Sequence, residues 1–264
     1  MANAPEQEYR TAACNGSAPS INTAPEITMK RLLPILLLCS LLLGSRAFAA
    51  PAAGEYILVI GGPSLMQWEK YKKQPHDHWW ANFVRAGRIR TQQIQAQDPD
   101  AMITWLVYKQ GYVDRAPQEK QDLLGHIASV RDKYNIKLIY FDKGNEVINY
   151  LNNGQPRDRI KIVNFEFYGH SNAKCFMFDY SSNIESACKS WLHEDELRKI
   201  NSRAFARNAF IKSWGCHTGE SMSKKWLAAI GVPMWGAIGK TQYQMEELPY
   251  LVSKQGQTAK WVNR

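Results

Sequence analysis

Short apolar runs alternate along the chain with longer segments whose apolar residues recur at helical spacing. The runs are about as long as buried strands and rich in Val, Ile, Leu and aromatic residues, as in a parallel sheet covered on both faces. We predict strands at residues 56–60, 101–108, 137–141, 159–168, 209–214 and 232–238, with an aromatic, strand-like run at 175–180. The predicted helical segments are residues 68–94, 118–134, 145–151, 192–200 and 221–230. This alternation predicts an α/β fold, a three-layer sandwich with a mostly parallel central sheet flanked by helices.

The N-terminal part of the chain departs from this pattern. Residues 1–28 are polar and aperiodic, so we expect a non-native or disordered leader upstream of the true start. Residues 29–49 have the basic start, apolar run and small-residue end of a secretory signal peptide. The apolar run of about a dozen residues is too short to cross a bilayer, which needs roughly 20. We therefore expect an exported, periplasmic or extracellular protein in which residues 50–264 form a single domain.

The charge balance is basic, with 33 Lys and Arg against 24 Asp and Glu and a formal net charge of +9. Such a surplus suits anionic partners, for example an acidic envelope surface. The basic residues are scattered rather than gathered in long runs, and the chain has no nucleic-acid-binding motif. We therefore predict a solvated basic surface and no specific nucleic-acid partner.

Cofactor motifs are absent as well. Gly61-Gly62 follows an apolar strand but lacks the further glycines or lysine of a nucleotide-binding loop. His76-Asp77-His78 is typical of a helix start rather than of a metal site. His170, Cys216 and His217 lack the close ligand spacing of a zinc centre. We predict no cofactor and no metal.

Two predicted strands end in a glycine followed by a residue with reactive chemistry. One strand runs into Gly169-His170 and another into Gly215-Cys216. Because the carboxyl ends of neighbouring parallel strands meet at one edge of a sheet, we expect these residues to converge. An imidazole beside a thiol can take its proton, and the resulting thiolate is a nucleophile. The sequence thus predicts a dyad in which Cys216 attacks and His170 assists.

A second interpretation of the same stretch makes Ser171 the nucleophile. Residues 169–173, Gly-His-Ser-Asn-Ala, fit the G-x-S-x-G/A nucleophile elbow of esterases and lipases. That elbow needs a helix directly after the serine, whereas the sequence here continues into an aromatic, strand-like run. We retain a serine esterase or lipase that uses Ser171 as a second alternative.

The predicted exported part contains three cysteines, Cys175, Cys188 and Cys216. Cys175 and Cys188 flank a short turn-like segment and can form a disulfide, which would leave Cys216 with a free thiol. A disulfide between Cys216 and either of the others would abolish the dyad. An unpaired thiol in an oxidising compartment is a liability unless it is buried or used, which again singles out Cys216.

The order of these features resembles that of the caspase-like cysteine peptidases of clan CD, which include legumains, gingipains, clostripain, separase and CHAT-type domains. The resemblance covers roughly the last 105 residues and rests on four stretches. They are IKIVNFEFYGHSN, WLHEDELRKI, AFIKSWGCHTGES and GVPMWGAIGKTQY, with YILVIGG as a first strand. The resemblance implies a caspase-like fold that hydrolyses peptide bonds.

The same resemblance implies roles for individual residues. Cys216 would be the nucleophile and His170 the base, and the backbone N–H groups of Ser171, Gly215 and Cys216 would face the oxyanion. Trp235, Gly169 and His217 would line the substrate pocket. The chain departs from the family pattern in two places. Ser171 stands where the family has a glycine after its histidine, and His217 follows the cysteine in place of the common Glu or Arg.

We therefore expect an exported cysteine peptidase acting on a peptide or protein substrate. The first alternative is a catalytically inactive binding or envelope protein on the same scaffold, which the side chain at Ser171 favours. The distance between the His170 imidazole and the Cys216 thiol, and the redox state of the cysteines, separate these possibilities.

Overall fold

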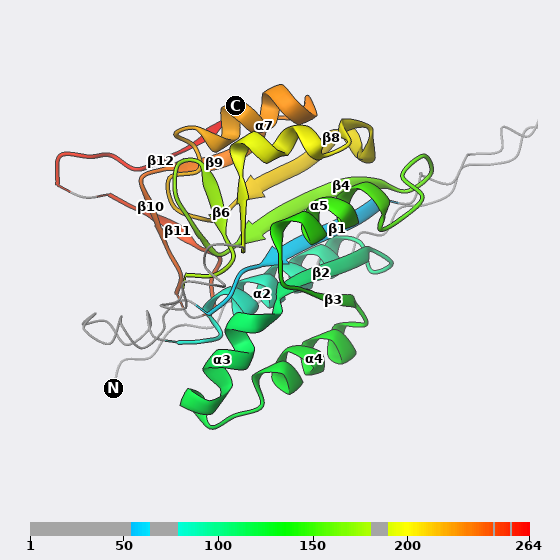
Figure 1. Cartoon of the computed structure of the whole chain (residues 1–264), viewed down its shortest axis with the longest axis vertical. Helices are drawn as coiled ribbons and strands as arrows, with labels where there is room; N and C mark the ends of the chain where they lie inside the picture. The colour runs from blue at the N-terminus through cyan, green and yellow to red at the C-terminus, as the bar shows by residue number, and fades with distance from the viewer. Residues whose placement is uncertain (1–53, 64–78, 181–189, 245, 254) are drawn as a thin grey trace, which may run out of the picture. The chain divides into compact units, whose positions relative to one another are not determined.

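The structure, a computed structural model, describes residues 54–63, 79–180, 190–244, 246–253 and 255–264. The described residues lie in one compact unit built on a seven-stranded sheet of order β12-β9-β8-β4-β1-β2-β3 (Figure 1). Its strands are β1 (Gly54–Ile60), β2 (Met102–Tyr108), β3 (Lys137–Phe141), β4 (Lys161–Tyr168), β8 (Phe205–Ser213), β9 (Met234–Ile238) and β12 (Lys260–Asn263). All neighbours pair in parallel except β12, which runs antiparallel to β9. The predicted α/β class with a mostly parallel sheet is confirmed.

Helices cover both faces of the sheet. They are α2 (Asn82–Gln97), α3 (Lys109–Glu119), α4 (Leu123–Tyr134), α5 (Gly144–Asn153) and α7 (Met222–Ile230). The first core cluster joins one sheet face to α5 and α7, and the second joins the other face to α2, α3 and α4. Two apolar faces on one sheet explain why β1 reads as an unbroken apolar run, with Ile57, Leu58, Val59 and Ile60 all fully buried.

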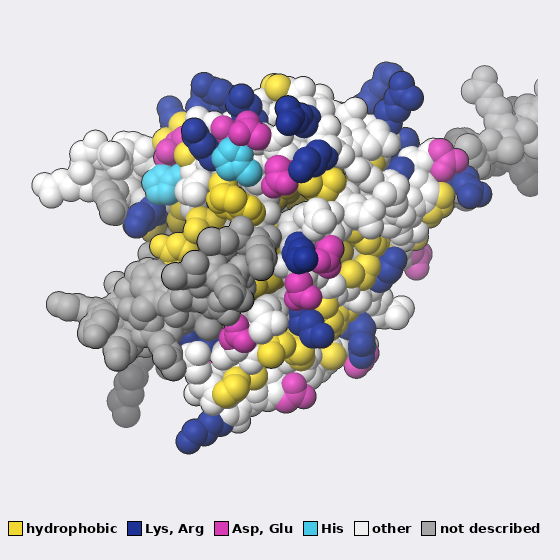
Figure 2. Space-filling model, in the orientation of Figure 1, with side chains coloured by type: hydrophobic (Ala, Val, Ile, Leu, Met, Phe, Trp, Pro, Cys, Tyr) yellow, Lys and Arg dark blue, Asp and Glu magenta, His cyan; other side chains and the backbone are white. Residues whose placement is uncertain are grey.

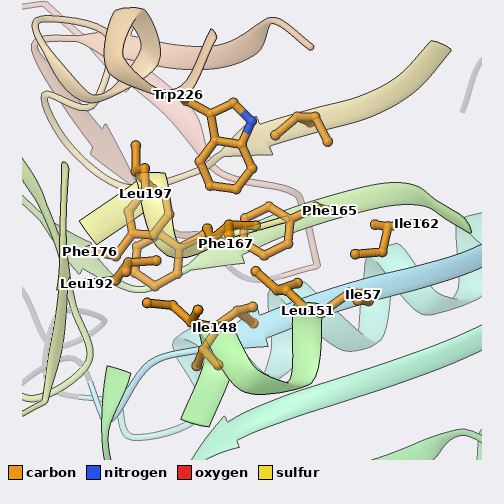
Figure 3. Close-up of a cluster of buried hydrophobic side chains, with 14 of the residues drawn as sticks. Ile57, Ile148, Leu151, Ile162, Phe165, Phe167, Phe176, Leu192, Leu197 and Trp226 are labelled. Atoms are coloured by element: carbon orange, nitrogen blue, oxygen red, sulfur yellow. The ribbon is translucent and has the colours of Figure 1, made fainter. Parts of the chain in front are cut away.

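Alternation within the strands decides which side chain enters which layer. In β4, Phe165 and Phe167 point into the first cluster, where Phe165 stacks on Trp226 with ring centroids 5.0 Å apart. Figure 3 shows this layer, in which Phe165 and Phe167 of β4 lie between Trp226 of α7 and Ile148 and Leu151 of α5. Glu166 and Tyr168, between and after the two phenylalanines, therefore face α2. The alternation thus sets which face of the sheet each side chain at the end of β4 contacts.

A small antiparallel sheet follows β4 and replaces a helical crossover. It consists of β5 (His170–Ser171), β6 (Cys175–Met177) and β7 (Trp191–His193). Two 3₁₀ helices, η3 (Glu194–Lys199) and η4 (Ser202–Ala204), then lead into β8. The segment predicted to be helical at 192–200 contains η3, whose first turn holds Glu194, Asp195 and Glu196 and is capped by the side chain of His193. The helix itself is shorter than predicted.

Other elements differ from the sequence-based expectation. The predicted helix over 118–134 corresponds to α4, which begins only at Leu123, and the prediction misses α3, which ends at Glu119 before a left-handed backbone at Lys120 with φ of 55°. The sequence prediction also misses the hairpin of β10 (Lys240–Gln242) and β11 (Tyr250–Val252), as well as the edge strand β12. Residues 1–53 and 64–78, which include the predicted signal peptide and the His76-Asp77-His78 cluster, lie outside the described residues.

The surface of the described part is mixed in charge. Figure 2 shows lysine and arginine side chains spread over the visible face among acidic ones, without one dominant basic patch. Within the described ranges, no helix has the length and apolar character needed to cross a membrane. Export and the nature of any anionic partner remain predictions.

Candidate active site

The two predicted chemical segments meet at the carboxyl edge of β4 and β8. Phe167 pairs with Ser213, and beyond this pair the Trp214 N–H donates to the Phe167 carbonyl at 2.8 Å. The Ser171 hydroxyl then donates to the Cys216 carbonyl at 2.6 Å. The structure thus brings the histidine-bearing and cysteine-bearing segments into direct contact, as the parallel topology predicts.

Glycine is required for this approach. A Cβ added to Gly215 would lie 2.1 Å from the Ser171 hydroxyl oxygen, and one added to Gly169 would lie 2.6 Å from the Phe167 ring. Both distances are far below van der Waals contact. A side chain at Gly215 would push the two segments apart, whereas one at Gly169 would displace the Phe167 ring within its own segment. Gly215 therefore allows the close approach of the two segments, and Gly169 leaves room for the core ring of Phe167.

His170 is half-buried in an aromatic setting. Its ring packs edge-on against Phe83 of α2, with centroids 5.2 Å apart, and lies 4.5 Å from the Tyr180 ring. Its backbone pairs with Met177 in the small sheet, and this pairing fixes the position of the backbone from which the imidazole extends. The position at the end of β4 is the predicted one.

The Cys216 thiol is free and half-buried, and its contacts are with Thr241. The Thr241 N–H donates to Sγ at 3.4 Å, and the Thr241 hydroxyl oxygen lies 3.6 Å from Sγ. In the described part of the chain, Sγ has no hydrogen bond to His170. Catalytic hydrogen bonds are often long in a substrate-free enzyme, so the dyad stays a prediction rather than an observed contact.

Tyr243 connects the elements around the thiol. Its hydroxyl accepts from the Gly169 N–H and donates to the Trp214 carbonyl, both at 3.3 Å. Its ring packs on Phe83, the same ring that contacts His170. Burial, and after it the nearby Cys216, raise the pKa of Tyr243 well above its ordinary range. Tyr243 is therefore a neutral phenol that ties the end of β4 to the end of β8.

The backbone N–H groups of Gly215 and Cys216, both predicted to donate to the oxyanion, differ in whether they already have an acceptor. The Gly215 N–H donates to the Ser213 hydroxyl at 3.3 Å. Among the described residues, the Cys216 N–H has no hydrogen-bond acceptor. An unused donor beside a thiol is what an oxyanion site requires, so Cys216 offers both its sulfur and its N–H.

His217 lines a pocket next to the thiol. It has a left-handed backbone with φ of 63°, uncommon for a residue with a side chain, and its Nδ1 lies 2.6 Å from Glu220 Oε1. The same carboxylate oxygen accepts from the Gly239 N–H at 3.3 Å. The pocket has a volume of about 480 Å³ and extends from this pair to the β10–β11 hairpin. The residues that line this pocket are His217, Glu220, 238–240, Val252 and 257–259 rather than His170 or Cys216, so the substrate-pocket role of His217 stays a prediction.

Trp235, predicted to line the substrate pocket, lies near the start of its strand rather than at its carboxyl end. It is the second residue of β9, paired with Lys212 of β8, and its side chain is exposed. The chain reaches Cys216 only after β9 has ended, at Gly239 and Thr241. The side chain of Trp235 is therefore set back from the edge at which the thiol lies, and its pocket role stays a prediction.

A fully buried carboxylate supports this edge from below. Glu166 accepts hydrogen bonds from Arg90, Tyr168 and the indole of Trp214, at 2.5, 2.8 and 2.7 Å. Lys212 lies with its ammonium 3.5 Å from the Trp214 ring centroid, and burial lowers its pKa to about 8. The network holds Trp214, whose carbonyl accepts the hydroxyls of Thr241 and Tyr243.

The remaining candidates lie around this site. Cys175 is a buried free thiol whose pKa burial raises to about 11, and Cys188 lies outside the described residues, so their pairing stays a prediction. An antiparallel hairpin rather than a helix follows Ser171. The Ser171 hydroxyl donates its hydrogen bond to the Cys216 carbonyl. This arrangement lacks the strand-to-helix turn of a nucleophile elbow.

The sequence analysis missed Thr241 and Tyr243. Both lie just after the predicted final strand in a polar stretch, Gly-Lys-Thr-Gln-Tyr, that has no periodicity to mark it. Within the described part of the chain, no group of three or more His, Cys, Asp or Glu side chains could hold a metal ion. No known protein family model, curated protein or solved structure matches the chain.

Proposed function

We propose that the protein is a cysteine peptidase-like hydrolase, with Cys216 as nucleophile and His170 as acid–base partner, acting on peptide or protein substrates outside the cytoplasm. The observation that carries the proposal is the 2.6 Å contact between Ser171 and the Cys216 carbonyl. It fastens the two chemical segments together at the edge of the sheet where ligands of open α/β folds bind.

The proposed reaction uses groups already described. The Cys216 thiolate attacks the scissile carbonyl, and the Cys216 N–H donates to the oxyanion that forms. The amine departs with a proton from the His170 imidazolium and leaves a thioester on Sγ. Water then attacks the thioester, His170 takes the proton, and the acid and the thiol are released.

Two features support this role for the sulfur. The thiol is half-buried rather than enclosed, and two groups of Thr241 surround it. Cys175 offers the contrast, because its side chain is buried and its pKa is raised to about 11. Reactive cysteines lie in partly exposed, donor-rich surroundings, whereas enclosed ones are inert.

The test compares three variants on a library of peptides. Cys216→Ala should abolish cleavage and prevent labelling by a thiol-directed peptide inhibitor. His170→Gln should lower kcat by roughly 10² to 10⁴, the range for loss of a general acid–base group. Cys175→Ala is the matched control and should keep full activity. Cleavage by Cys216→Ala at the unaltered rate would overturn the proposal.

A non-catalytic binding protein is the second candidate, and the position of Ser171 favours it. The Ser171 side chain fills the space between the two segments where the related peptidases have a glycine. Peptides that bind with equal affinity to the unaltered protein and to Cys216→Ala, without turnover by either, would establish that role.

A further inference from the structure

Thr241 contacts the sulfur of Cys216 with both its backbone and its side chain. Its N–H already donates to Sγ, at 3.4 Å, and its hydroxyl oxygen lies 3.6 Å from Sγ. The titratable side chains at this edge are His170, His217, Glu220 and Tyr243. In the part of the chain that the structure describes, none of these four side chains forms a hydrogen bond with the sulfur. The partner of the nucleophile in the substrate-free protein is therefore Thr241.

The hydroxyl of Thr241 has two acceptors within reach. In the present arrangement it donates to the Trp214 carbonyl at 2.8 Å, while the neutral thiol donates to the Thr241 backbone carbonyl at 3.7 Å, a hydrogen bond that ends when the thiol ionises. A negative sulfur would prefer the hydroxyl hydrogen to a lone pair, because hydrogen bonds to ionised groups are the stronger ones. Rotation about the Cβ–Oγ1 bond alone moves that hydrogen from the carbonyl to the sulfur.

The carbonyl that would lose this hydrogen bond keeps another. The Tyr243 hydroxyl also donates to the Trp214 carbonyl, at 3.3 Å, and Tyr243 is itself a neutral phenol. A buried carbonyl without any donor is costly, so this second donor lowers the free-energy cost of the rotation. Thr241 and Tyr243 thus act together on one acceptor.

We propose that Thr241 stabilises the thiolate of Cys216 with two donors, its backbone N–H and a hydroxyl that turns from the Trp214 carbonyl to the sulfur. When the thiol ionises, its S–H bond breaks, the proton passes to the His170 imidazole of the proposed dyad, and the electron pair stays on sulfur. Tyr243 acts as a positioning residue that satisfies the Trp214 carbonyl in the ionised state. The inference rests on the proposed function and deepens it by naming the group that sustains its nucleophile.

The test measures alkylation of Cys216 by iodoacetamide, resolved by site with mass spectrometry because other cysteines are present. Thr241→Val should slow the reaction at pH 7 about tenfold, the effect of losing one hydrogen bond to a charged group. At pH 10, where thiols ionise without help, its rate should equal that of the unaltered protein. Thr241→Ser keeps the hydroxyl and should stay within about twofold at both pH values.

Two further variants and a control distinguish loss of the Thr241 hydroxyl from misfolding and from non-specific effects. Thr241→Ala removes the hydroxyl without adding bulk and should repeat the Thr241→Val result if that variant does not fold. Tyr243→Phe should slow alkylation at pH 7 by about threefold, because rotation would then leave the Trp214 carbonyl without a donor. Ser129→Ala, which removes an exposed hydroxyl on α4, is the control and should change nothing.

The result can go against the proposal in two ways. If Thr241→Val reacts at the unaltered rate at pH 7, the hydroxyl does not stabilise the thiolate. If it is slower by the same factor at pH 7 and pH 10, Thr241 governs access to the sulfur rather than its charge. Because alkylation measures the sulfur and not peptide cleavage, a chain that cleaves no peptide leaves this test intact.

Discussion

The two ends of the central sheet treat their buried polar groups differently. At the amino end, Glu55 is fully buried and both of its oxygens are used. Thr104 and Tyr150 donate to one oxygen and Arg157 to the other, each at 2.6 Å. Arg157 uses its remaining donors on the carbonyls of Leu151 and Tyr150. Every charged atom in this network has a partner.

At the carboxyl end, several groups are not fully satisfied. The Cys216 N–H lacks an acceptor among the described residues, and His217 has a strained backbone. In α2, two residues after Phe83, the Arg85 guanidinium is 4% exposed, yet its Nε and Nη1 have no hydrogen-bond partner in the described part. Unused donors and strain are tolerated in proteins mainly where they serve a function. We infer that the amino end stabilises the fold and that the carboxyl end is where chemistry takes place.

The largest effect is expected from disrupting the Glu55 network at the amino end of the sheet. Arg157→Met leaves the Glu55 carboxylate buried without its cation, so we expect a loss of about 3 to 5 kcal/mol in the free energy of unfolding. Urea titration monitored by circular dichroism measures it. Where the variant is still folded, the alkylation rate of Cys216 should be unchanged, because the Glu55 network and the thiol lie at opposite ends of the strands.

The control for Arg157→Met is an exposed ion pair of the same kind. Arg131 donates to Asp132 from Nε and Nη2, at 2.7 and 3.0 Å, but both side chains are largely exposed. Arg131→Met should cost less than about 1 kcal/mol. Equal losses for the two variants would show that burial of the Glu55 network adds nothing to stability.

The sequence was sufficient for the strands of the sheet and insufficient for its outer additions. The predicted strand at 137–141 is matched residue for residue by β3, and β1, β2, β4, β8 and β9 all overlap their predicted ranges. The central strands β1, β2 and β4 are buried along most of their length, so their apolar runs are long and distinct. The edge strand β12 and the hairpin β10–β11 have polar or mixed sequences, and tertiary packing rather than periodicity defines them.

Helix α3 is another element that the sequence pattern does not reveal, because its residues have poor helix propensity. Its sequence contains Gly111 and Pro117, residues with poor helix propensity, and the stretch has the composition of a connection. In the structure, Tyr112 of α3 is fully buried and its hydroxyl donates to the Gly61 carbonyl at 2.8 Å. Packing against the end of β1 therefore overrides the local propensity.

Within the candidate site, sequence reasoning finds the residues that the topology places together. The segments that carry His170 and Cys216 meet, through Ser171 and the Cys216 carbonyl, because parallel strands end at one edge, a general rule. Thr241 and Tyr243 come from beyond the last predicted strand, and the side on which that segment returns depends on the three-dimensional turn at Gly239, where φ is 90°. No spacing in the sequence encodes that return.

A smaller effect sharpens the contrast between the two thiols. Burial raises the pKa of Cys175 to about 11, above its value in the unfolded chain. Between about pH 9 and 11 the unfolded state therefore binds fewer protons than the folded state, and stability falls as the pH rises. Urea titrations at pH 8 and pH 10 in reducing buffer should show this fall, and Cys175→Ala should show less of it.

The comparison to make is between pH values within each protein, because alanine leaves a small cavity at Cys175 at any pH. A fall of the same size in Cys175→Ala and in the unaltered protein would assign the pH dependence to other groups. In that case Cys175 would not be the enclosed, inert thiol that the contrast with Cys216 assumes.

The smallest expected effect concerns the second buried arginine. Burial lowers the pKa of Arg85, and its guanidinium keeps only one hydrogen bond, to Asn82 at 3.0 Å, and a stacking contact with Trp79. Arg85→Met removes two unsatisfied donors together with these two interactions while it keeps the aliphatic stem. Because two of the Arg85 donors have no partner among the described residues, relief of the desolvation penalty should offset the loss of the Asn82 hydrogen bond and the Trp79 stacking, and we expect a change within about 1 kcal/mol of zero. A loss as large as that of Arg157→Met, measured in the same urea titration, would mean that Arg85 is satisfied and that the two ends of the sheet are not different in kind.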